Sequence, residues 1–336
     1  MKSYMQKEIS EQPDIIEKKI DYWTDSAKRI RYLIEDKQNI VLLGRGTSGN
    51  ACIFASYLFG LTTGRHPIDF RPWLSTQETP LADWSDSVVL AYTQSGESSD
   101  IVHSAEWLSR RGAKVIAVTN SQNKMSSISK VANETFYLDV GEELAVPATK
   151  TFSAQLFATA ALAGLDIKEA AFEISKAMRD YLNSNVPKKL NDFIISKSVI
   201  IWLARGLIQP AALDASLKLQ ETVGISSFGW SSAEFLHGPV ASLNENDCVI
   251  IFDDNENQNI PDSESKIINI LSQKKVEYYK LSDKPGDKVI SLSLPKDKWA
   301  KTILYSFIGQ HVALTLAEKK GLNPDKPHGL KKVTLT

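Results

Sequence analysis

The sequence has little of several features that define other protein classes. Its 336 residues include only two cysteines, Cys52 and Cys248, which lie far apart and outside any Cys-x-x-Cys motif. This pattern predicts neither a disulfide framework nor a zinc site, so we expect no bound metal. Scarce and unpaired cysteines are typical of a reducing compartment, and we therefore expect a cytoplasmic protein.

Neither an excess of basic charge nor a long apolar run is present. Lys and Arg number 39 against 40 Asp and Glu, which gives a formal net charge of −1. Because a surface that binds a polyanion normally has a basic excess, we expect no nucleic-acid partner. No stretch is long and apolar enough to span a bilayer, so no membrane partner is expected. The N-terminus is charged throughout and is not expected to be a signal peptide.

What is present is the composition of a globular protein with a sizeable core. Hydrophobic residues make up 43% of the chain and charged residues 24%, and the length suggests two domains of roughly 150 residues each. Apolar residues recur at near-helical spacing in residues 1–35, with Lys and Glu between them, which predicts an N-terminal helical segment. These apolar residues are Ile15, Ile16, Ile20, Trp23, Ile30 and Leu33.

Apolar strands alternate with helical patterns in two sets. In residues 36–180, apolar strands are expected in IVLL, at the start of SVVLAYTQSG, in AKVIAVTN and in NETFYLDVG. In residues 190–320, they are expected in SVIIWLARG, at the start of CVIIFDDNENQNIPDSES and at the end of KIINILSQKKVEYYKLS. Continuous apolar strands that alternate with helices indicate parallel sheets covered on both faces. The predicted fold class is therefore α/β, with two doubly wound parallel sheets flanked by helices. The polar segment 181–193 is expected to connect the two sets, and residues 321–336 to form a tail.

Two loops at successive strand ends of the first set are rich in small hydroxyl residues. In open parallel sheets, ligands bind at the carboxyl ends of strands, where helix N-termini favour an anion. Hydroxyl groups donate to phosphate oxygens, and glycine lets the backbone approach closely. The predicted phosphate-binding residues are Thr47 and Ser48 in the first loop and Thr93, Gln94, Ser95, Gly96 and Ser98 in the second. The alternative for each loop is an ordinary polar turn with a helix N-cap.

The motifs GRGTS, TQSGESSD and GEELAVPATKTFSAQL resemble the sugar isomerase (SIS) domain family. Their order and spacing are most similar to the isomerase half of glucosamine-6-phosphate synthase and to stand-alone SIS-type glucosamine-6-phosphate deaminases. The resemblance covers nearly the whole chain, through ALDASLKLQETVG and EFLHGP to DKPHGLKKVT. It implies two SIS subdomains, each a flavodoxin-like parallel sheet between helices. It also implies a sugar-phosphate substrate, no metal or organic cofactor, and a dimer.

Glu221 and Lys218 are candidates for proton transfer. They lie three residues apart in LKLQETVG, hence on one face of the predicted helix. A surface salt bridge is the alternative for any such pair. The resemblance implies that Glu221 moves a proton between C1 and C2 of the sugar and that Lys218 lies in the same site. A carboxylate in a partly dry pocket can have its pKa raised toward the working range.

A histidine and a C-terminal lysine complete the candidate set. His237 follows Glu234 by three residues, and imidazole has the unperturbed pKa that suits proton transfer near neutrality. The resemblance implies that His237 opens the sugar ring and is donated across the interface of a homodimer; a structural histidine is the alternative. It also implies that the tail closes over the sugar and that Lys332 forms an imine with the open ketose. Lys331 or a solvated basic tail are the alternatives there.

Two departures from the family pattern bear on function. The synthases carry a glutaminase domain that begins with a nucleophilic cysteine, whereas this chain begins Met-Lys-Ser, so we expect no glutamine hydrolysis by this chain. Ala148 stands where the synthases have a serine that contacts the sugar, and Thr93 replaces a serine in the phosphate loop. We therefore expect deamination of glucosamine 6-phosphate to fructose 6-phosphate and ammonia. The alternatives are a fructosamine-6-phosphate deglycase, another aldose–ketose isomerase, or a non-catalytic sugar-phosphate sensor.

Overall fold

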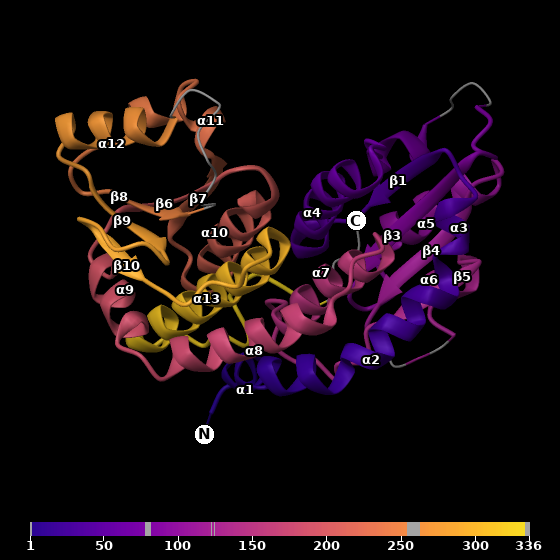
Figure 1. Cartoon of the computed structure of the whole chain (residues 1–336), viewed down its shortest axis with the longest axis horizontal. Coiled ribbons are helices and arrows are strands. Elements are labelled where there is room, and N and C mark those ends of the chain that lie inside the picture. Colours follow the sequence, from indigo (N-terminus) through magenta and orange to yellow (C-terminus); the bar gives the residue numbers. More distant parts are fainter. Residues whose placement is uncertain (1, 78–81, 122, 124, 254–262, 333–336) are drawn as a thin grey trace. The chain divides into compact units, whose positions relative to one another are not determined.

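The computed structural model describes residues 2–77, 82–121, 123, 125–253 and 263–332 (Figure 1). The chain divides into two compact units, each built around one five-stranded sheet. Unit 1 comprises Met1–Pro13 and Phe172–Leu330, and unit 2 comprises Asp14–Ala171 and Lys331–Thr336. The last four residues of the expected tail lie outside the described residues.

The sheet of unit 2 has the strand order β2-β1-β3-β4-β5, and all its neighbouring strands are parallel. The strands are β1 (Asn39–Leu43), β2 (Ile68–Asp69), β3 (Ser87–Thr93), β4 (Lys114–Thr119) and β5 (Glu134–Tyr137). This is the order of a flavodoxin-like sheet, whose switch point lies between β1 and β3. The predicted α/β class and parallel sheet are confirmed in this unit.

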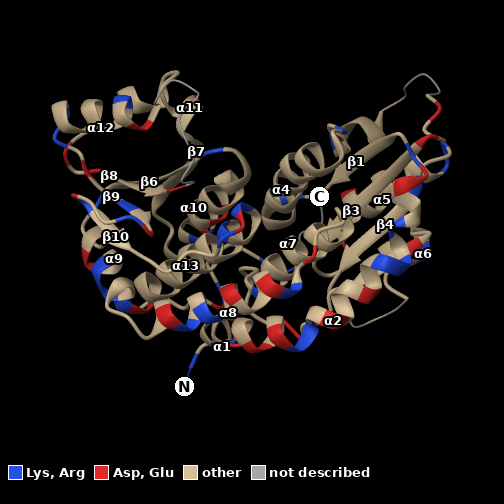
Figure 2. Ribbon diagram, viewed as in Figure 1, with Lys and Arg blue, Asp and Glu red and all other residues tan. Residues whose placement is uncertain are grey.

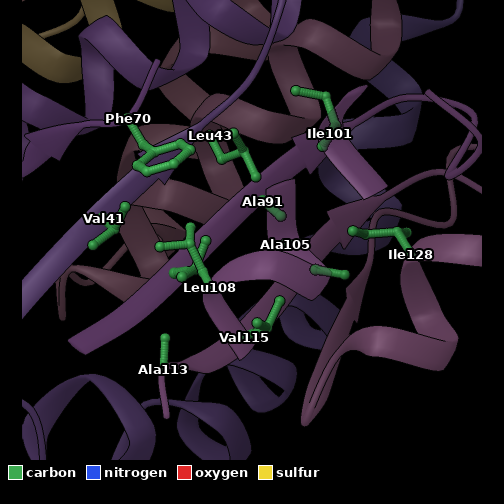
Figure 3. Close-up of a cluster of buried hydrophobic side chains, with 12 residues drawn as sticks. Val41, Leu43, Phe70, Ala91, Ile101, Ala105, Leu108, Ala113, Val115 and Ile128 are labelled. Atoms are coloured by element: carbon green, nitrogen blue, oxygen red, sulfur yellow. The ribbon is translucent and has the colours of Figure 1, made fainter. Parts of the chain in front are cut away.

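Helices cover both faces of this sheet. They are α3 (Tyr32–Glu35), α4 (Gly46–Thr63), η1 (Pro72–Thr76), α5 (Ser99–Ser109), α6 (Ser127–Val131) and α7 (Lys150–Leu162), together with parts of α2 (Gln12–Ile30) and α8 (Lys168–Leu182). On one face, Val41 and Leu43 pack with Leu108 of α5 and Ile128 of α6 (Figure 3). Burying a leucine such as Leu108 contributes about 1.5–3 kcal/mol relative to leaving it exposed.

The opposite face of the same strands packs against another set of helices. Tyr92 of β3 is fully buried, and its hydroxyl forms a 2.8 Å hydrogen bond with the hydroxyl of Thr159 on α7. α4 contacts both β1 and β3, and it also contacts α7. Because β1 and β3 are buried on both faces, their carboxyl ends are fixed, and so are the loops that follow them.

The sheet of unit 1 repeats this arrangement with the order β10-β9-β8-β6-β7, again with all neighbours parallel. The strands are β6 (Val199–Ala204), β7 (Ser226–Ser231), β8 (Cys248–Phe252), β9 (Glu277–Ser282) and β10 (Val289–Ser291). Taken from β6 as the first strand, the order is also 2-1-3-4-5, and the switch point lies between β6 and β8. The second predicted parallel sheet is confirmed.

Two long helices of unit 1, α10 and α13, pack closely on each other. A Cβ atom placed on Gly309 of α13 would lie 2.5 Å from Cβ of Ala215 on α10, so only glycine permits this approach. The helices of the unit are α1 (Tyr4–Ser10), α9 (Val186–Ile194), η2 (Gly206–Ile208), α10 (Gln209–Val223), α11 (Ser232–Phe235), η3 (Pro239–Ser242), α12 (Ser263–Gln273) and α13 (Lys298–Lys319). This packing buries the side chains of α10 that face α13.

Some elements differ from the sequence prediction. The polar segment 181–193, expected as a connection, is mostly helical, because α9 buries Leu190 and Ile194 while its lysines stay outside the core. Strands β2, β7 and β10 were not predicted, since two of them are only two or three residues long and β7 has the polar sequence SSFGWS.

Surface helices of the chain carry charges of both signs. Acidic and basic residues are interspersed along α2 and α8 (Figure 2), as expected for helices with one apolar face. None of the helices in the described part of the chain is long and apolar enough to cross a bilayer.

Candidate active site

The loop after β1 and the first turn of α4 form the first hydroxyl-lined loop of unit 2. Gly44 has to be a glycine, because a Cβ atom there would lie 2.6 Å from the carbonyl oxygen of Ser48. Gly46 has a φ of 53°, in the left-handed region that favours glycine. Nε2 of Gln155 on α7 donates a 2.9 Å hydrogen bond to Oγ of Ser48. Since Ser48 accepts this bond, its own hydroxyl proton is available to a ligand oxygen.

The loop after β3 is organised by Thr93 and Gly96. Oγ1 of Thr93 accepts the backbone N–H of Gly96 at 3.2 Å and lies 3.3 Å from Oγ of Ser98. Gly96 has a φ of 77°, and a Cβ atom there would lie 2.8 Å from Oγ of Ser126. Both the backbone conformation and the lack of space therefore require glycine at this position. The turn delivers Ser98 to the N-terminus of α5, where unpaired N–H groups favour an anion.

Ser95 and Gln94 form the tip of this second loop. Oγ of Ser95 accepts the N–H of Glu97 at 3.2 Å, and the Glu97 carboxylate accepts the hydroxyl of Ser127 at 2.5 Å. The acidic side chain of the loop is thus bound by α6. Within the described residues the side-chain amide of Gln94 has no partner, so it can donate to a ligand.

Asn120 joins the second loop to the segment after β5. Its N–H donates to the carbonyl oxygen of Gln94 at 3.1 Å. Its side chain donates to the carbonyl oxygen of Gly141 at 2.8 Å and accepts the N–H of Val140 at 3.1 Å. The loops that follow β3, β4 and β5 are therefore held together at one edge of the sheet.

A buried glutamate, Glu143, lies at the start of α7. Its Oε1 accepts the N–H groups of Thr149 and Thr151 at 2.9 and 3.1 Å, and its Oε2 accepts the hydroxyl of Thr151 at 2.7 Å. Nζ of Lys332 forms an ion pair with the same Oε2 at 3.1 Å and donates to the carbonyl oxygen of Ala145 at 2.6 Å. The C-terminal lysine predicted from the sequence is thus bound to the loop that contains Ala148.

The charge of Glu143 is stabilised by its partners. Burial by itself raises the pKa of this carboxyl, but the positive charge of Lys332 and the hydrogen bonds from Thr149 and Thr151 outweigh it and lower the pKa. Glu143 is therefore ionised at neutral pH, with its negative charge at the N-terminus of a helix, where the helix dipole favours it.

The remaining predicted residues of unit 2 line the same loops. Thr47 is half-buried in the first turn of α4, and Ala148 is half-buried just before α7 and offers no hydroxyl. A cavity of about 710 Å³ adjoins the first loop and is lined by residues that include Gly44, Arg45 and Tyr57, but by none of the predicted phosphate-binding residues. This volume is within the range of small-molecule sites.

In unit 1, α10 carries the predicted proton-transfer pair. Nζ of Lys218 lies 2.5 Å from Oε2 of Glu221, and the Lys218 side chain is fully buried whereas the Glu221 side chain is 21% exposed. A buried ammonium group is costly unless it is paired with a carboxylate. The surface salt bridge that was the alternative for this pair is therefore wrong, because Lys218 is inside the core. The carboxylate of Glu221 is the member of the pair that a substrate can reach.

Further buried polar side chains lie between α10 and α13. Nε2 of Gln310 is 3.5 Å from Oδ2 of Asp214, and Oε1 of Gln310 accepts Nε2 of Gln12 at 2.8 Å. Asp214 is fully buried one helical turn before Lys218. The helix face that holds the pair is thus polar along two turns and fixed by residues from α2 and α13.

His237 lies on the turn after α11. Its backbone N–H donates to the carbonyl oxygen of Glu234 at 3.0 Å, and its imidazole is exposed and has no hydrogen-bond partner within the described residues. By contrast, His311 is half-buried, with Nδ1 3.4 Å from the hydroxyl of Tyr181, and burial lowers the pKa of His311 to about 4. Of these two imidazoles, the exposed one of His237 is the one that can meet a ligand.

Comparison with known protein families identifies the family of this chain. The SIS domain family matches residues 33–165 and, a second time, residues 193–317. The chain belongs to the SIS domain family. The curated glutamine–fructose-6-phosphate aminotransferase of Sulfurisphaera tokodaii is 26% identical over 98% of this chain, and that of Thermococcus kodakarensis is 29% identical over 98%. This SIS chain spans only 56% and 57% of those two relatives, a little over half of their length.

Solved SIS structures share the fold. The C-terminal domain of glucosamine-fructose-6-phosphate aminotransferase from Francisella tularensis has a TM-score of 0.83 at 23% identity, covering 97% of this chain and 98% of that one. A glucosamine-6-phosphate deaminase from Thermotoga maritima gives 0.77 at 18% identity, covering 99% and 100%. A tagatose-6-phosphate ketose/aldose isomerase from Escherichia coli gives 0.80 at 16% identity, covering 98% and 96%. The two sheets thus form the two SIS subdomains.

Several polar residues of the SIS loops were not predicted from the sequence. Gln155 lies within a helix and Asn120 directly follows a strand. Nothing in the sequence around either residue indicates which loop its side chain contacts. Glu143 lies within the motif GEELAVPATK, but its role depends on Lys332, which is 189 residues away. The sequence shows Glu143 only as an acidic residue six positions before the N-cap of α7, which by itself does not indicate a site residue.

Proposed function

We propose that this protein is a phosphosugar enzyme that converts glucosamine 6-phosphate and water into fructose 6-phosphate and ammonia. The observation that carries the proposal is the buried ion pair of Lys218 and Glu221, a costly feature that a protein which only binds sugar phosphate does not need. The hydroxyl-lined loops of unit 2 support a phosphate-bearing substrate. We further propose a cytoplasmic homodimer.

Phosphate binding is the role of the two loops. Oγ of Ser48 accepts Nε2 of Gln155, which leaves the Ser48 hydroxyl proton for a ligand, and the side-chain amide of Gln94 has no partner among the described residues. These donors, with Thr47, Ser95 and the N-terminus of α5, match a phosphate group, which only accepts hydrogen bonds. A hydrogen bond to a charged group contributes about 1.5–3 kcal/mol.

Proton transfer is the role of the other unit. His237, donated by the partner subunit, opens the sugar ring, and Glu221 removes the proton from C2 and returns it to C1. The amine at C2 becomes an imine in this step, and water then replaces it as ammonia. Nζ of Lys218 lies 2.5 Å from Oε2 of Glu221, so a positive charge holds the carboxylate that carries the proton in one position.

The test is an assay of ammonia release from glucosamine 6-phosphate, with Glu221→Gln as the variant. General base catalysis contributes about 100- to 10,000-fold, so the variant should lose at least that much in kcat. Glu245→Gln, an exposed glutamate of the same unit, is the matched control and should retain full activity. Wild-type turnover by Glu221→Gln would remove the proposed base.

One observation favours a second candidate, a phosphosugar enzyme with another amine or none. Ala148 lacks the hydroxyl expected beside the sugar, so the hydroxyl or amine end of the substrate is less tightly specified than the phosphate end. Deglycation of fructosamine 6-phosphates and aldose–ketose isomerisation would use the same loops and the same base. A panel of sugar phosphates that differ at C1 and C2 distinguishes them. Binding without turnover of any member would instead indicate a sensor.

A further inference from the structure

The carboxylate of Glu143 is a rigid anchor. Its side chain is fully buried, and each of its two oxygens accepts hydrogen bonds from the residues that begin α7. Thr149 is the N-cap of that helix, and every residue from Lys150 to Leu162 is buried. Because the helix cannot move without disturbing the core, the carboxylate has a fixed position relative to the loops of unit 2.

The amine of Lys332 is fixed by this anchor but remains accessible. Two of its three N–H groups are directed to Glu143 and to the carbonyl oxygen of Ala145, at 3.1 and 2.6 Å. No third partner is present within the described residues, and the side chain is 25% exposed. Lys331, the neighbouring lysine, is exposed and has no such partner in the described part of the chain. An exposed lysine near a chain end needs a buried counter-charge to occupy one position, and Glu143 supplies it only to Lys332.

We infer that Glu143 is a positioning residue that holds the Lys332 amine beside the sugar-binding loops for reaction with the substrate carbon. This inference rests on the proposed function. In the reaction, the Lys332 ammonium gives one proton to the nitrogen of the C2 imine. The lone pair of Nζ of Lys332 forms the new C–N bond, and a second proton passes from the lysine nitrogen to the former imine nitrogen. Ammonia then leaves with the electrons of the old C–N bond. Water then hydrolyses the lysyl iminium, which returns the ketone and the Lys332 ammonium, so that atoms and charge balance.

Glu143 does not itself remove the proton in this scheme. Its pKa is lowered, so it stays ionised and remains the acceptor and counter-charge that holds Nζ of Lys332 at 3.1 Å. Its contribution is position, and a displacement of about 1 Å at a reacting group costs roughly 100-fold in rate.

A labelling experiment tests the contact without using activity. Reductive methylation with formaldehyde, followed by peptide mass spectrometry, should modify Lys332 more slowly than Lys331 in the full-length protein. In Glu143→Gln the two rates should become similar, and in Glu143→Asp, which keeps the charge, Lys332 should remain the slower. Equal rates in the wild type, or no change in Glu143→Gln, would overturn the inference.

An activity experiment separates positioning from structural support. Borohydride added during turnover should attach the sugar to Lys332 in the wild type. Glu143→Gln should reduce both this adduct and kcat by roughly 10- to 100-fold while KM changes little. In a Lys332→Met background, adding Glu143→Gln should cause no further loss of kcat.

The failures of this inference and of the proposed function are distinguishable. If Glu143→Gln lowers kcat equally with and without Lys332, Glu143 only stabilises α7, and the inference is overturned. If the wild type releases no ammonia while the labelling rates respond as expected, the contact stands and the proposed reaction fails.

Discussion

The two units have the same topology and the same turn after their first strand, yet they carry different chemistry. Arg45 and Arg205 follow β1 and β6 with nearly equal backbone angles, φ −132° and ψ 155° against φ −135° and ψ 147°. Gly46 and Gly206 come next, with φ values of 53° and 54°. The backbone of the switch point is therefore duplicated in the two SIS subdomains.

The two arginines also make equivalent contacts. Nε of Arg45 donates to Asp100 in the first turn of α5 at 2.7 Å, and Nη1 of Arg205 donates to Oγ of Ser263 at the start of α12 at 3.2 Å. In each unit, the loop after the first strand is thus tied to the helix after the third strand. Ser263 is uncharged, so the contact in unit 1 is the weaker of the two.

The side chains around these turns differ. After β3, unit 2 has the hydroxyl-rich loop of Thr93 to Ser98, whereas β8 of unit 1 is followed by Asp253, whose carboxylate accepts the hydroxyl of Ser282 at 2.5 Å. Nζ of Lys280 lies 3.3 Å from the same carboxylate, so this strand end holds an internal ion pair, whereas the loop of unit 2 presents hydroxyl and N–H donors that attract an anion. The SIS backbone thus offers a switch point twice, and the two differ in their side chains; under the proposed function, those of unit 2 are the ones that suit a phosphate.

The helices that follow these turns, α4 and α10, also carry different side chains at matching positions. Leu58 of α4 and Lys218 of α10 lie at equal sequence distances from Gly46 and Gly206, and both are buried. Changing both Lys218 and Glu221 to Leu makes α10 resemble α4. Ammonia release should fall by about 100- to 10,000-fold, while the free energy of unfolding should stay equal or rise, because apolar replacement of a buried ion pair is often neutral or stabilising by about 1–4 kcal/mol.

The single change Glu221→Leu is the control for that prediction. It removes the carboxylate from a fully buried ammonium group and should lower the free energy of unfolding by about 3 kcal/mol. Denaturant unfolding followed by circular dichroism measures both. A double variant that still releases ammonia would contradict the proposed role of the pair.

Acid should act on unit 1 through His311. Burial lowers the pKa of His311 to about 4 from 6.5, so the unfolded chain binds more protons than the folded chain between these pH values. Stability is therefore fully present above pH 6.5 and is lost as the pH falls toward 4, by about 3 kcal/mol. His311→Leu should flatten this dependence in unfolding curves measured from pH 7 to pH 4. An unchanged slope in that variant would contradict the assignment.

Gly96 should be more sensitive to substitution than a glycine that has only a positive φ. Gly96→Ala adds a contact of 2.8 Å with Ser126 to the strain of a left-handed conformation, whereas Gly64 has a φ of 70° and nothing within 4 Å of a Cβ atom. Gly64→Ala should cost about 1 kcal/mol, and Gly96→Ala about 1–3 kcal/mol together with a loss of phosphate binding. Thermal unfolding and calorimetric titration with inorganic phosphate measure these effects. Equal costs at the two sites would show that space at Gly96 does not matter.

Removal of one hydroxyl group at each switch point, by Ser48→Ala and Ser263→Ala, compares their contributions to substrate binding. Ser48→Ala removes a donor to the phosphate and should raise KM by about 10-fold, since a hydrogen bond to a charged group contributes roughly 1.5–3 kcal/mol. Ser263→Ala, at the switch point of unit 1, should leave KM unchanged. A raised KM in Ser263→Ala would indicate that the second switch point also binds substrate.

The sequence predicted the fold well because burial and periodicity are local signals. Apolar runs such as Val88 to Tyr92 are buried on both faces and could be read as parallel strands. β7 was missed because its sequence, SSFGWS, is mostly polar and its pairing with β6 depends on distant residues. The helix α9 was missed because Pro187 and two lysines obscure the apolar positions Leu190 and Ile194.

The candidate site could be predicted from the sequence where a side chain contacts residues of its own motif. Thr93, Gly96 and Ser98 form one turn, and their contacts could be expected from spacing. The donation from Gln155 to Ser48 joins residues 107 positions apart, and no local pattern encodes it. The burial of Lys218 depends on α13 packing against α10, so the sequence could suggest the pair but not its environment.

The most direct test of the account is turnover of glucosamine 6-phosphate in deuterium oxide, followed by NMR of the product. If the loops of unit 2 bind the phosphate while Glu221 moves the proton, the wild type should give fructose 6-phosphate with deuterium at C1. Glu221→Gln should bind the substrate with unchanged Kd and give no labelled product. Deuterium at C1 formed by Glu221→Gln at the wild-type rate would contradict the account.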